Sequence, residues 1–480
     1  MRNTKIVCTL GPATSSETMV ARLIDAGMSV ARLNFSHGSH DDHRRMIGII
    51  RKVSAQLNAP VAILQDLQGP KLRVGKIKDS SVELHKGRLI RITTEDVIGT
   101  AELVSTTYKQ LPNDVQAGDR ILLDDGLLQL RVEEVQSHQI VCKILEGGTL
   151  SDHKGINLPG IYISQPSFTE KDHADLLFGI GQEVDLVAIS FVRCAADVAQ
   201  VKKLIAEHNK DILVLAKLEK PEAIRDLDAI LTVADGAMIA RGDLGVELPL
   251  EKVPLLQKQI IRTALQKGKP VITATQMLES MRFYTRPTRA EVSDVANAIF
   301  DGTDAVMLSA ETATGKYPIA AVKTMAKIIV EAEQSLQTES TLRNSWPGNK
   351  RIHGIPDLIS LSTCAAAEHL NLKAIIAFTT SGFTARMLAK YRPLSRIIAF
   401  TPSQLVQRQL SLSWGVVPMK TDEIKNTDEV VLQTVRRLLE NKLVKPGDIV
   451  AILLGAPLFK KGTTNLMKLH VIGEDDEMII

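Results

Sequence analysis

Apolar runs of strand length recur along much of the chain, separated by amphipathic stretches and polar turns. Eight of these runs cover residues 5–11, 29–36, 61–67, 185–192, 211–219, 235–241, 270–276 and 304–311. All but the third are followed directly by a helical pattern, for example residues 196–209 after the fourth run. Buried parallel strands read as continuous apolar runs, so this alternation predicts an α/β fold with a (β/α)8 TIM barrel.

The long gap after the third run holds a different pattern. Between residues 70 and 166, short strands with alternating polar and apolar positions are broken by turn signals. This pattern predicts a small β-barrel inserted into the larger one, with Pro70 and Pro166 as the hinges of a lid. We expect the larger barrel to comprise residues 1–69 and 167–343, and the lid to comprise residues 70–166.

A second alternation of strands and helices follows a polar stretch near residue 340. Strand patterns at residues 374–382, 396–403, 415–420 and 448–455 predict an open α/β domain that spans residues 344–480. Residues 466–473 add an expected edge strand.

The composition excludes several classes of protein. Of the 480 residues, 44% are hydrophobic, 24% charged and 4% aromatic, as in a globular enzyme rather than a disordered chain. The net charge of +3 is too small to predict nucleic-acid binding. No CxxC pair, signal-peptide pattern or membrane-spanning apolar run is present. We therefore expect a cytoplasmic protein without a zinc site, a disulfide framework, a membrane partner or a nucleic-acid partner.

Candidate chemistry lies at the ends of the barrel strands, because active sites of such barrels lie at the carboxyl ends of the strands. Lys217 and Glu219 close the fifth strand and, being two residues apart, share a face. The alternative is a strand that has already ended, followed by two solvated charges before Pro221. Other strands end in further polar or glycine residues: Arg32, Asn34, Ser36, His37, Asp66, Lys71, Arg73, Arg241, Gly242, Asp243, Thr275, Gln276, Ser309 and Glu311.

Glu219 and Asp243 come from neighbouring strands and form a candidate site for Mg²⁺, which proteins hold with one or two carboxylates. Arg32, Arg73 and Lys217 supply the positive charge that a phosphorylated substrate needs. Each signal alone also has a purely structural explanation. An Arg-Gly-Asp triplet, for example, is commonly a loop. Packing alone does not require polar groups at so many strand ends, so together they predict a Mg²⁺-dependent site that handles phosphoryl groups.

The chain also carries TKIVCTLGPAT, ARLNFSHG, GPKLR, KGINLPG, AKLE, ARGDLGVE, ATQMLESM, RPTRAEVSDVANAIFDGTDAVMLSAETATGKYP and SGFTARMLAKYRP, from residue 4 to past residue 392. In this order and spacing they resemble the pyruvate kinase family, of a bacterial type. The resemblance implies transfer of the phosphoryl group of phosphoenolpyruvate to ADP, which gives pyruvate and ATP in the last step of glycolysis. It also implies an allosteric homotetramer in which residues 344–480 form the regulatory domain.

By the same resemblance, Glu219 and Asp243 would bind Mg²⁺, or Mn²⁺ in its place. Lys217 would neutralise charge on the moving phosphoryl group and on the enolate that remains. Other matching positions would border ADP or reach toward its phosphates: Thr9, Pro12, Asn34, His37, Arg73, Lys154 and Arg32.

The resemblance further implies that the backbone N–H groups of Gly242 and Asp243 bind the substrate carboxylate. Thr275 would lie near the enolate carbon that must be protonated, and Ser309 would feed a proton relay. The bland alternative for both hydroxyls is a strand-end side chain that bonds to backbone.

One stretch departs from the family pattern. Potassium-dependent members read Asp-Thr-Lys-Gly-Pro-Glu where this chain reads DLQGPK, with Leu67 and Lys71 at the second and sixth positions. The Lys71 ammonium would take the role of K⁺, which Asn34, Ser36 and Asp66 would otherwise help to coordinate. We expect that no monovalent cation is required. The alternative is that Lys71 is a solvated residue at the lid hinge.

The sequence TTSGFTAR at residues 379–386 places hydroxyls and a glycine between a strand and a helix. Backbone N–H groups at a helix N-terminus, together with hydroxyls, bind anions, although an ordinary N-cap has the same sequence. In the family this position binds the phosphate of an activator, here a sugar bisphosphate, a sugar monophosphate or AMP. Four residues match it: Thr379, Thr380, Ser381 and Thr384. Lys460 and Lys461 would close over the activator.

Two other functions compete with this interpretation. A Mg²⁺-dependent carbon-carbon lyase acting on pyruvate or phosphoenolpyruvate also places Glu and Asp ligands at barrel strand ends, but it needs neither the lid nor a lysine at 217. A non-catalytic sensor of phosphometabolites would use the C-terminal anion site alone. The presence of Lys217, Glu219 and Asp243 argues against a sensor.

Overall fold

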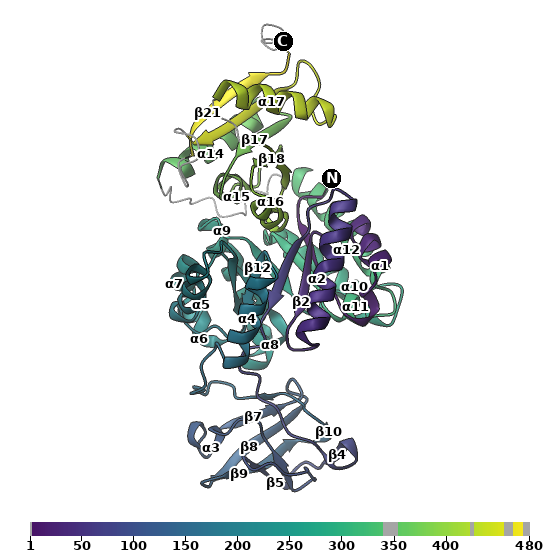
Figure 1. The fold of residues 1–480 in the computed structure, drawn as a ribbon. Coiled ribbons are helices and arrows are strands. Elements are labelled where there is room, and N and C mark those ends of the chain that lie inside the picture. Colours follow the sequence, from purple (N-terminus) through teal and green to yellow (C-terminus); the bar gives the residue numbers. More distant parts are fainter. Residues whose placement is uncertain (1, 339–353, 423–426, 456–463, 474–480) are drawn as a thin grey trace.

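The computed structural model describes residues 2–338, 354–422, 427–455 and 464–473. Three units follow one another along its length, with the lid at one end, the barrel in the middle and the C-terminal α/β domain at the other end (Figure 1). The predicted fold class is thereby confirmed. The predicted boundary between residues 343 and 344 lies outside the described residues, and the boundaries at 70 and 166 stay predictions.

The eight apolar runs form the strands of a closed parallel barrel. In order around the barrel these are β1 (Lys5–Thr9), β16 (Ala305–Leu308), β15 (Val271–Ala274), β14 (Gly236–Ala240), β13 (Leu213–Leu218), β12 (Leu186–Ile189), β3 (Ala62–Asp66) and β2 (Val30–Asn34). In β3, β12, β14, β15 and β16 every residue is buried, which explains why these stretches show no polar alternation.

Helices surround the barrel, and their apolar faces pack on the outward-facing strand residues to form its largest core cluster (Figure 1). Several begin where the sequence provides a cap, because a Ser or Thr side chain accepts the N–H of the third helical residue. The helices around the barrel are α1 (Glu17–Ala26), α2 (His40–Gln56), α4 (Glu170–Gly181), α5 (Ala195–Glu207), α6 (Pro221–Arg225), α7 (Leu227–Val233), α8 (Arg241–Glu247), α9 (Val253–Gln266), α10 (Arg289–Phe300), α11 (Ala310–Ala313) and α12 (Pro318–Thr338).

The lid expected as a small β-barrel is a curled six-stranded sheet joined by a two-stranded ribbon. The six strands run in the order β11 (Ile156–Asn157), β7 (Arg120–Leu123), β8 (Leu128–Val135), β9 (Gln139–Glu146), β5 (Leu89–Thr93) and β6 (Leu103–Ser105). The ribbon pairs β10 (Gly148–Ser151) with β4 (Ser81–Leu84), and α3 (Leu111–Asp114) is a short helix beside them. The lid has its own hydrophobic core, separate from that of the barrel.

The C-terminal domain is an open five-stranded sheet with helices on both faces. Its strands run in the order β19 (Val416–Lys420), β18 (Arg396–Thr401), β17 (Ala374–Phe378), β20 (Ile449–Gly455) and β21 (Thr464–Val471), and β21 is the predicted edge strand, which is antiparallel. Its helices are α14 (Ile355–His369), α15 (Phe383–Lys390), α16 (Gln404–Gln409) and α17 (Thr427–Glu440).

The junction between the barrel and this domain is buried and charged. Arg392 is 3% exposed, forms an ion pair with Asp304 at 2.9 Å, and lies over the ring of Trp414. Lys5 at the start of the barrel donates to the Val416 carbonyl at 2.7 Å. Buried polar contacts of this kind fix one relative placement of two packed surfaces.

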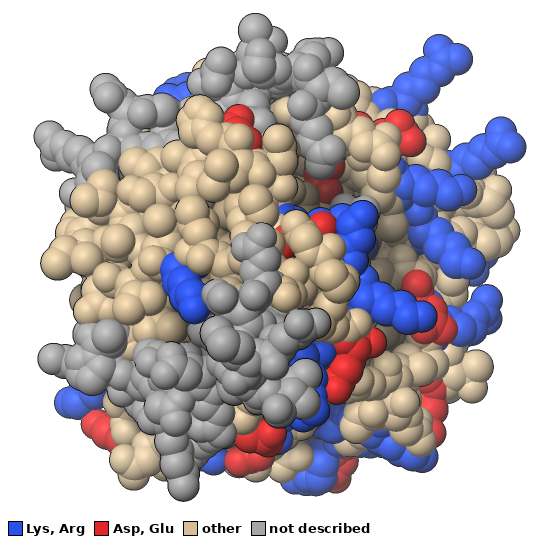
Figure 2. Space-filling model, turned by 90° about the horizontal axis from the view of Figure 1, so that it is seen from above, with Lys and Arg blue, Asp and Glu red and all other residues tan. Residues whose placement is uncertain are grey.

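Seen from the end that carries the C-terminal domain, Lys and Arg side chains gather along one side of the molecule, while uncharged residues cover much of the remainder (Figure 2). Both signs of charge occur on this face, in keeping with the small net charge. Within the described residues, every helix is too short or too polar to cross a membrane.

Candidate active site

The charged pair at the end of β13 is buried in the rim of the barrel. The Lys217 side chain is 13% exposed and that of Glu219 is fully buried. The Lys217 ammonium lies 3.3 Å from Asp66 Oδ1 and 3.7 Å from Glu219 Oε2, and it donates to Ser190 Oγ at 2.6 Å. The alternative of two solvated charges after a finished strand is therefore wrong.

The protonation of this cluster follows from burial and from its neighbours. Burial alone would lower the pKa of Lys217, but the carboxylates of Asp66 and Glu219 outweigh it and raise that pKa above its ordinary value. Burial raises the pKa of Glu219 to about 7 against the opposing charge of Lys217. Burial also acts to raise the pKa of Asp66, yet Lys217 and Arg32 hold it below its ordinary value. The lysine is a firmly charged ammonium at the centre of the rim.

Arg32 extends this cluster toward the first strand. Its Nε bonds to Asp66 Oδ2 at 2.7 Å, and its Nη1 donates to Thr9 Oγ1 at 2.9 Å. Thr9 in turn donates to the Leu308 carbonyl, so its hydroxyl fixes the guanidinium. Three strand ends, β1, β2 and β3, thus hold one cation in place.

Asp243 approaches the cluster from the first turn of α8, which begins directly after β14. Its charge acts on both Lys217 and Glu219, which places the three groups in one electrostatic neighbourhood. The N–H of Gly242 donates to Thr275 Oγ1 at 2.8 Å. Ser309 follows β16, and its N–H donates to a buried carboxylate oxygen of Glu311 at 2.7 Å.

The chemistry of the carboxylates at the rim suits a hard cation. Glu219 Oε1 accepts the Phe191 N–H at 2.5 Å, but the buried Oε2 has no hydrogen-bond partner among the described residues. A buried carboxylate oxygen without such a partner is costly unless something positive meets it. No group of three or more His, Cys, Asp or Glu side chains in the described ranges is arranged as a metal site. Proteins usually bind Mg²⁺ through one or two carboxylates, and Glu219 and Asp243 would supply these.

The residues expected around a nucleotide are divided between the barrel rim and the lid. Asn34 is the last residue of β2, the exposed His37 follows that strand, and the exposed Pro12 follows β1. On the lid side, Arg73 donates to the His153 carbonyl at 2.9 Å and Lys154 forms an ion pair with Asp124 at 2.8 Å.

Residues of both halves act on His37. Burial lowers the pKa of His37, and the charges of Lys71, Arg73 and Arg32 lower it further. Positive charges from both units thus act on the imidazole, and they make the opening between lid and barrel attractive to anions.

The residues predicted to replace or coordinate a monovalent cation lie at the same strand ends. Asn34 Oδ1 accepts the Ser36 N–H at 3.1 Å, and Asp66 is engaged by Arg32 and Lys217. Lys71 is exposed at the root of the lid. Its charge is one of those that lower the pKa of His37.

Sequence reasoning missed two residues that bind the side chains of Lys217 and Glu219. Ser190 accepts from Lys217 and donates to the Leu67 carbonyl at 2.7 Å, and the Phe191 N–H bonds to Glu219. Phe191 has φ +55, a left-handed conformation that a bulky residue rarely adopts. The amino-acid type does not indicate which backbone N–H acts as a donor. In the structure, the positive φ of Phe191 marks the position.

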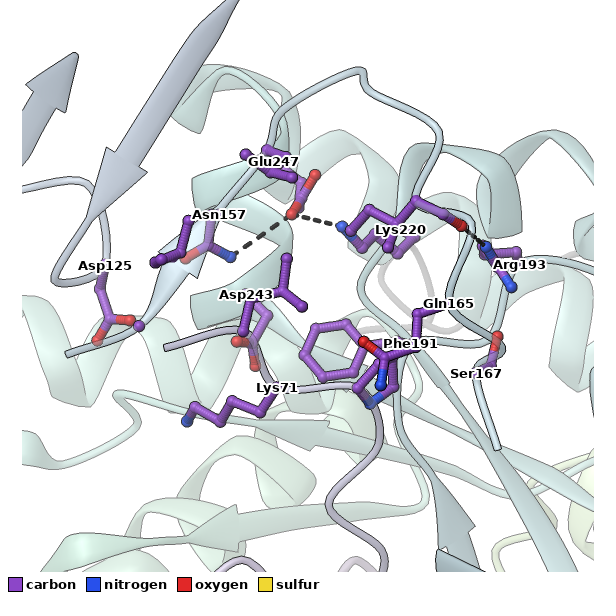
Figure 3. Close-up of a pocket in the computed structure, with 16 residues that line it drawn as sticks. Lys71, Asp125, Asn157, Gln165, Ser167, Phe191, Arg193, Lys220, Asp243 and Glu247 are labelled. Atoms are coloured by element: carbon purple, nitrogen blue, oxygen red, sulfur yellow. Dashed lines mark hydrogen bonds and ion pairs between the residues drawn. The ribbon is translucent and has the colours of Figure 1, made fainter. Parts of the chain in front are cut away.

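A further missed pair lies in the cleft between lid and barrel. Lys220 and Glu247 are both buried and form an ion pair at 2.7 Å, and Asn157 of the lid approaches the same carboxylate at 3.5 Å. Figure 3 shows this group beside Asp243 and Lys71, with side chains from both units lining the cleft.

The predicted effector loop lies between β17 and α15. Gly382, with φ +78, precedes the first turn of α15, and Thr384 Oγ1 lies 2.6 Å from Thr464 Oγ1. Thr379 is buried and bonds through its N–H to the Phe400 carbonyl. Thr380 and Ser381 line a cavity of about 270 Å³ whose basic lining residues are Arg386, Lys202 and Lys210. Lys460 and Lys461 lie outside the described residues.

Comparisons with known proteins agree over nearly the whole chain. Residues 1–322 match the family model described as pyruvate kinase, barrel domain, and residues 357–470 match that described as pyruvate kinase, alpha/beta domain. Pyruvate kinases of Staphylococcus aureus strains MRSA252 and USA300 are each 49% identical over 478 residues, which is 99% of this chain and 81% of theirs. The crystal structure of a pyruvate kinase from Cryptosporidium parvum superposes with a TM-score of 0.90 at 38% identity, covering 98% of this chain and 96% of that one.

Proposed function

The chain belongs to the pyruvate kinase family, and on that premise we propose which of its residues carry the reaction. The chain is a phosphotransferase that moves the phosphoryl group of phosphoenolpyruvate to ADP, which yields pyruvate and ATP. The observation that carries the assignment of residues is the ammonium of Lys217, buried at the rim between Asp66 and Glu219.

Lys217 neutralises the charge that develops on the phosphoryl group during transfer and on the enolate left behind. Its contacts with Ser190 and Asp66 support this role, because a cation that is already oriented needs no reorganisation when charge moves. Arg32, fixed by Asp66 and Thr9, reaches toward the phosphates as a second cation.

Glu219 and Asp243 would hold Mg²⁺, or Mn²⁺ in its place. Glu219 Oε2 supports this assignment, because it is buried, accepts no hydrogen bond from the described residues and lies 3.7 Å from the Lys217 ammonium. The position of the two carboxylates at neighbouring strand ends supports it as well. When bound, such an ion supplies positive charge to the oxygens of the substrate. The backbone N–H groups of Gly242 and Asp243 would orient the substrate carboxylate. Without substrate the Gly242 N–H donates to Thr275 Oγ1 at 2.8 Å, so it would have to exchange this partner for the carboxylate.

Protonation of the enolate completes the reaction, because its methylene carbon must take up one proton to become the methyl group of pyruvate. Thr275, which follows β15, would present this proton. Without substrate its hydroxyl accepts the Gly242 N–H and donates to the Ala274 carbonyl, the backbone bonding that the alternative role also predicts. Ser309, at the end of the neighbouring strand β16, would belong to the relay that returns the proton from solvent.

ADP would bind in the opening between rim and lid, bordered by Thr9, Pro12, Asn34, His37, Arg73 and Lys154. The cations around His37 support this placement, since they supply charge for the phosphates from both units. Closure of the lid would bring Arg73 and Lys154 onto the nucleotide and exclude water from the transfer.

The enzyme would need no K⁺, because the ammonium of Lys71 would supply the positive charge of the cation that Asn34, Ser36 and Asp66 would otherwise help to coordinate. Its reach to His37 supports this role, and its exposure supports the competing role of a solvated hinge residue. Pyruvate formation in buffer free of K⁺ and NH₄⁺, before and after KCl is added at constant ionic strength, separates the two. Full activity before addition supports Lys71 as the internal cation, and activity only after addition refutes it.

The C-terminal domain would bind a phosphorylated activator through Thr379, Thr380, Ser381 and Thr384. The adjoining cavity is lined by three basic residues, which support an anionic ligand, and also by Asp211 and Asp235, of which Asp235 pairs with Lys202 at 2.8 Å. We further propose a cytoplasmic homotetramer, and for the domains the boundaries 1–69 with 167–343, 70–166 and 344–480.

Turnover by the Lys217→Met variant tests the assignment. Mg²⁺-dependent pyruvate formation from phosphoenolpyruvate and ADP should be lost in the variant, while Mn²⁺ binding is retained. Near-normal turnover would rule out the role given to Lys217. Family membership disfavours the lyase and the sensor, and phosphoenolpyruvate-dependent ATP formation by the unaltered chain would exclude both.

A further inference from the structure

The turn after β15 is strained at the residue that carries the proposed proton-handling hydroxyl. Thr275 has φ +69 and Gln276 has φ +55, so two successive residues with side chains adopt the left-handed conformation. For a β-branched residue such as Thr this conformation is a clear outlier. Strain of this kind persists only where the surroundings enforce it, and it gathers at functional sites.

Arg241 is the side chain that grips this turn. Its Nε donates to the Ala274 carbonyl at 3.2 Å and its Nη2 to the Thr275 carbonyl at 2.7 Å. The outer edge of the guanidinium forms a two-pronged pair with Asp294 of α10, each nitrogen 2.7 Å from one carboxylate oxygen. The Arg241 side chain is only 12% exposed, and its donors point at protein groups rather than at the space where a substrate binds.

The same strand end also orients the hydroxyl. Directly after Arg241, the N–H of Gly242 donates to Thr275 Oγ1 at 2.8 Å, and that hydroxyl donates to the Ala274 carbonyl at 2.6 Å. On the far side of the turn, Glu311 accepts the Leu278 N–H at 3.1 Å. The turn is held at both ends, and Arg241 binds it at the strained residue itself.

We propose that Arg241 is a positioning residue for protonation of the enolate, acting through the backbone of Thr275. This inference rests on the proposed function, in which the Thr275 hydroxyl gives a proton to the enolate carbon and is reprotonated from solvent. Arg241 fixes the backbone that presents the hydroxyl, while Asp294 keeps Arg241 in place. Lysine cannot reproduce this arrangement, because it lacks the planar fork that binds two carbonyls and a carboxylate together.

The test compares Arg241→Lys, Asp294→Asn and Thr275→Val with the unaltered enzyme. Turnover is measured with phosphoenolpyruvate and ADP, and enolate protonation is measured as exchange of pyruvate methyl hydrogens into ²H₂O with Mg²⁺ and ATP, followed by NMR. For Arg241→Lys we expect kcat and exchange to fall together by about 10²-fold, since small misplacements of a reacting group cost this much. The KM for phosphoenolpyruvate should stay within about twofold, because on this proposal Arg241 does not bind substrate.

Asp294→Asn should act in the same direction with a smaller loss, and it serves if Arg241→Lys does not fold. The double variant Arg241→Lys with Thr275→Val should be no slower than Thr275→Val alone. Once the hydroxyl is absent, its positioning by Arg241 no longer affects the rate. Arg392→Lys is the matched control. It alters a buried arginine that also binds a carboxylate and a carbonyl, but at the opposite end of the barrel, and it should leave the exchange rate unchanged.

The outcomes separate this inference from the function on which it rests. Exchange within twofold of the unaltered enzyme in both Arg241→Lys and Asp294→Asn would overturn the inference while the proposed function stands. Losses that multiply in the double variant would overturn it too. Failure of the unaltered chain to form pyruvate from phosphoenolpyruvate and ADP would instead overturn the proposed function.

Discussion

Replacing Lys217 by Met removes an ammonium that lies 3.3 Å from Asp66 Oδ1 and 3.7 Å from Glu219 Oε2, while it keeps most of the side-chain volume. At an effective dielectric constant of about 20, each separation corresponds to about 5 kcal/mol of attraction. Both carboxylates are buried, so the variant leaves negative charge uncompensated. We expect the free energy of unfolding to fall by about 3–5 kcal/mol.

The loss of activity should be larger than this loss of stability can explain. A cation that meets the charge of a moving phosphoryl group contributes about 10³–10⁵-fold to kcat. We therefore expect kcat for pyruvate formation to fall by that factor at saturating phosphoenolpyruvate and Mg²⁺, at a temperature where the variant is still folded. Circular dichroism on the same sample measures the folded fraction.

Lys390→Met provides the matched control, because Lys390 is as deeply buried and forms an ion pair with Asp357 at 2.8 Å in the C-terminal domain. Its stability loss should be comparable, about 3–5 kcal/mol, whereas kcat without activator should stay within about threefold. Two results would refute the reasoning. One is a Lys217→Met variant within tenfold of the unaltered kcat, and the other is an equal loss of kcat in both variants.

Further predictions concern other parts of the chain. Lys71→Glu should make turnover depend on K⁺, and unchanged turnover in K⁺-free buffer would contradict the role of Lys71. Burial lowers the pKa of Lys5 to about 8 from 10.5, so between these pH values the unfolded chain binds more protons and the free energy of unfolding rises with pH. Lys5→Met should flatten that rise in urea titrations at pH 8 and 10, and an equal slope in both proteins would count against it. Arg392→Ala leaves buried Asp304 unpaired and should cost about 3–5 kcal/mol in urea unfolding; a cost below about 1 kcal/mol would disagree. Ser381→Asp should abolish activation by sugar phosphates or AMP at an unchanged basal rate, and retained activation would exclude the loop as the phosphate site.

The barrel could be predicted because burial on both faces leaves an unbroken apolar run, as in Ala62–Asp66. The lid was less predictable, since alternation of polar and apolar residues marks strands but not their partners. Its sheet includes the parallel pair of β5 with β6, with Arg91 opposite Leu103, and curls without closing. Which strands pair there depends on contacts between distant residues, and no local pattern encodes them.

The site was predictable to the extent that charge in an apolar context stands out, as with Lys217 and Glu219. Asp66 was expected beside a monovalent cation, yet the structure pairs it with Arg32 and Lys217, because barrel order brings β2, β3, β12 and β13 together. Pairings across strands follow from the closed sheet, which a single sequence does not reveal. Backbone donors such as the N–H of Phe191 are equally silent, since any residue can provide them.

The place at which the lid is inserted has a consequence for the order of folding. β3 pairs with β12, so Leu64 must find Leu186, and closure of the barrel joins Lys5 to Ala305. The lid, by contrast, draws its strands from the stretch between Ser81 and Asn157. As the chain leaves the ribosome, the lid can condense as a local unit while β1, β2 and β3 still wait for their partners. The part proposed to close during catalysis is thus expected to be the first to fold, and the rim beneath it among the last.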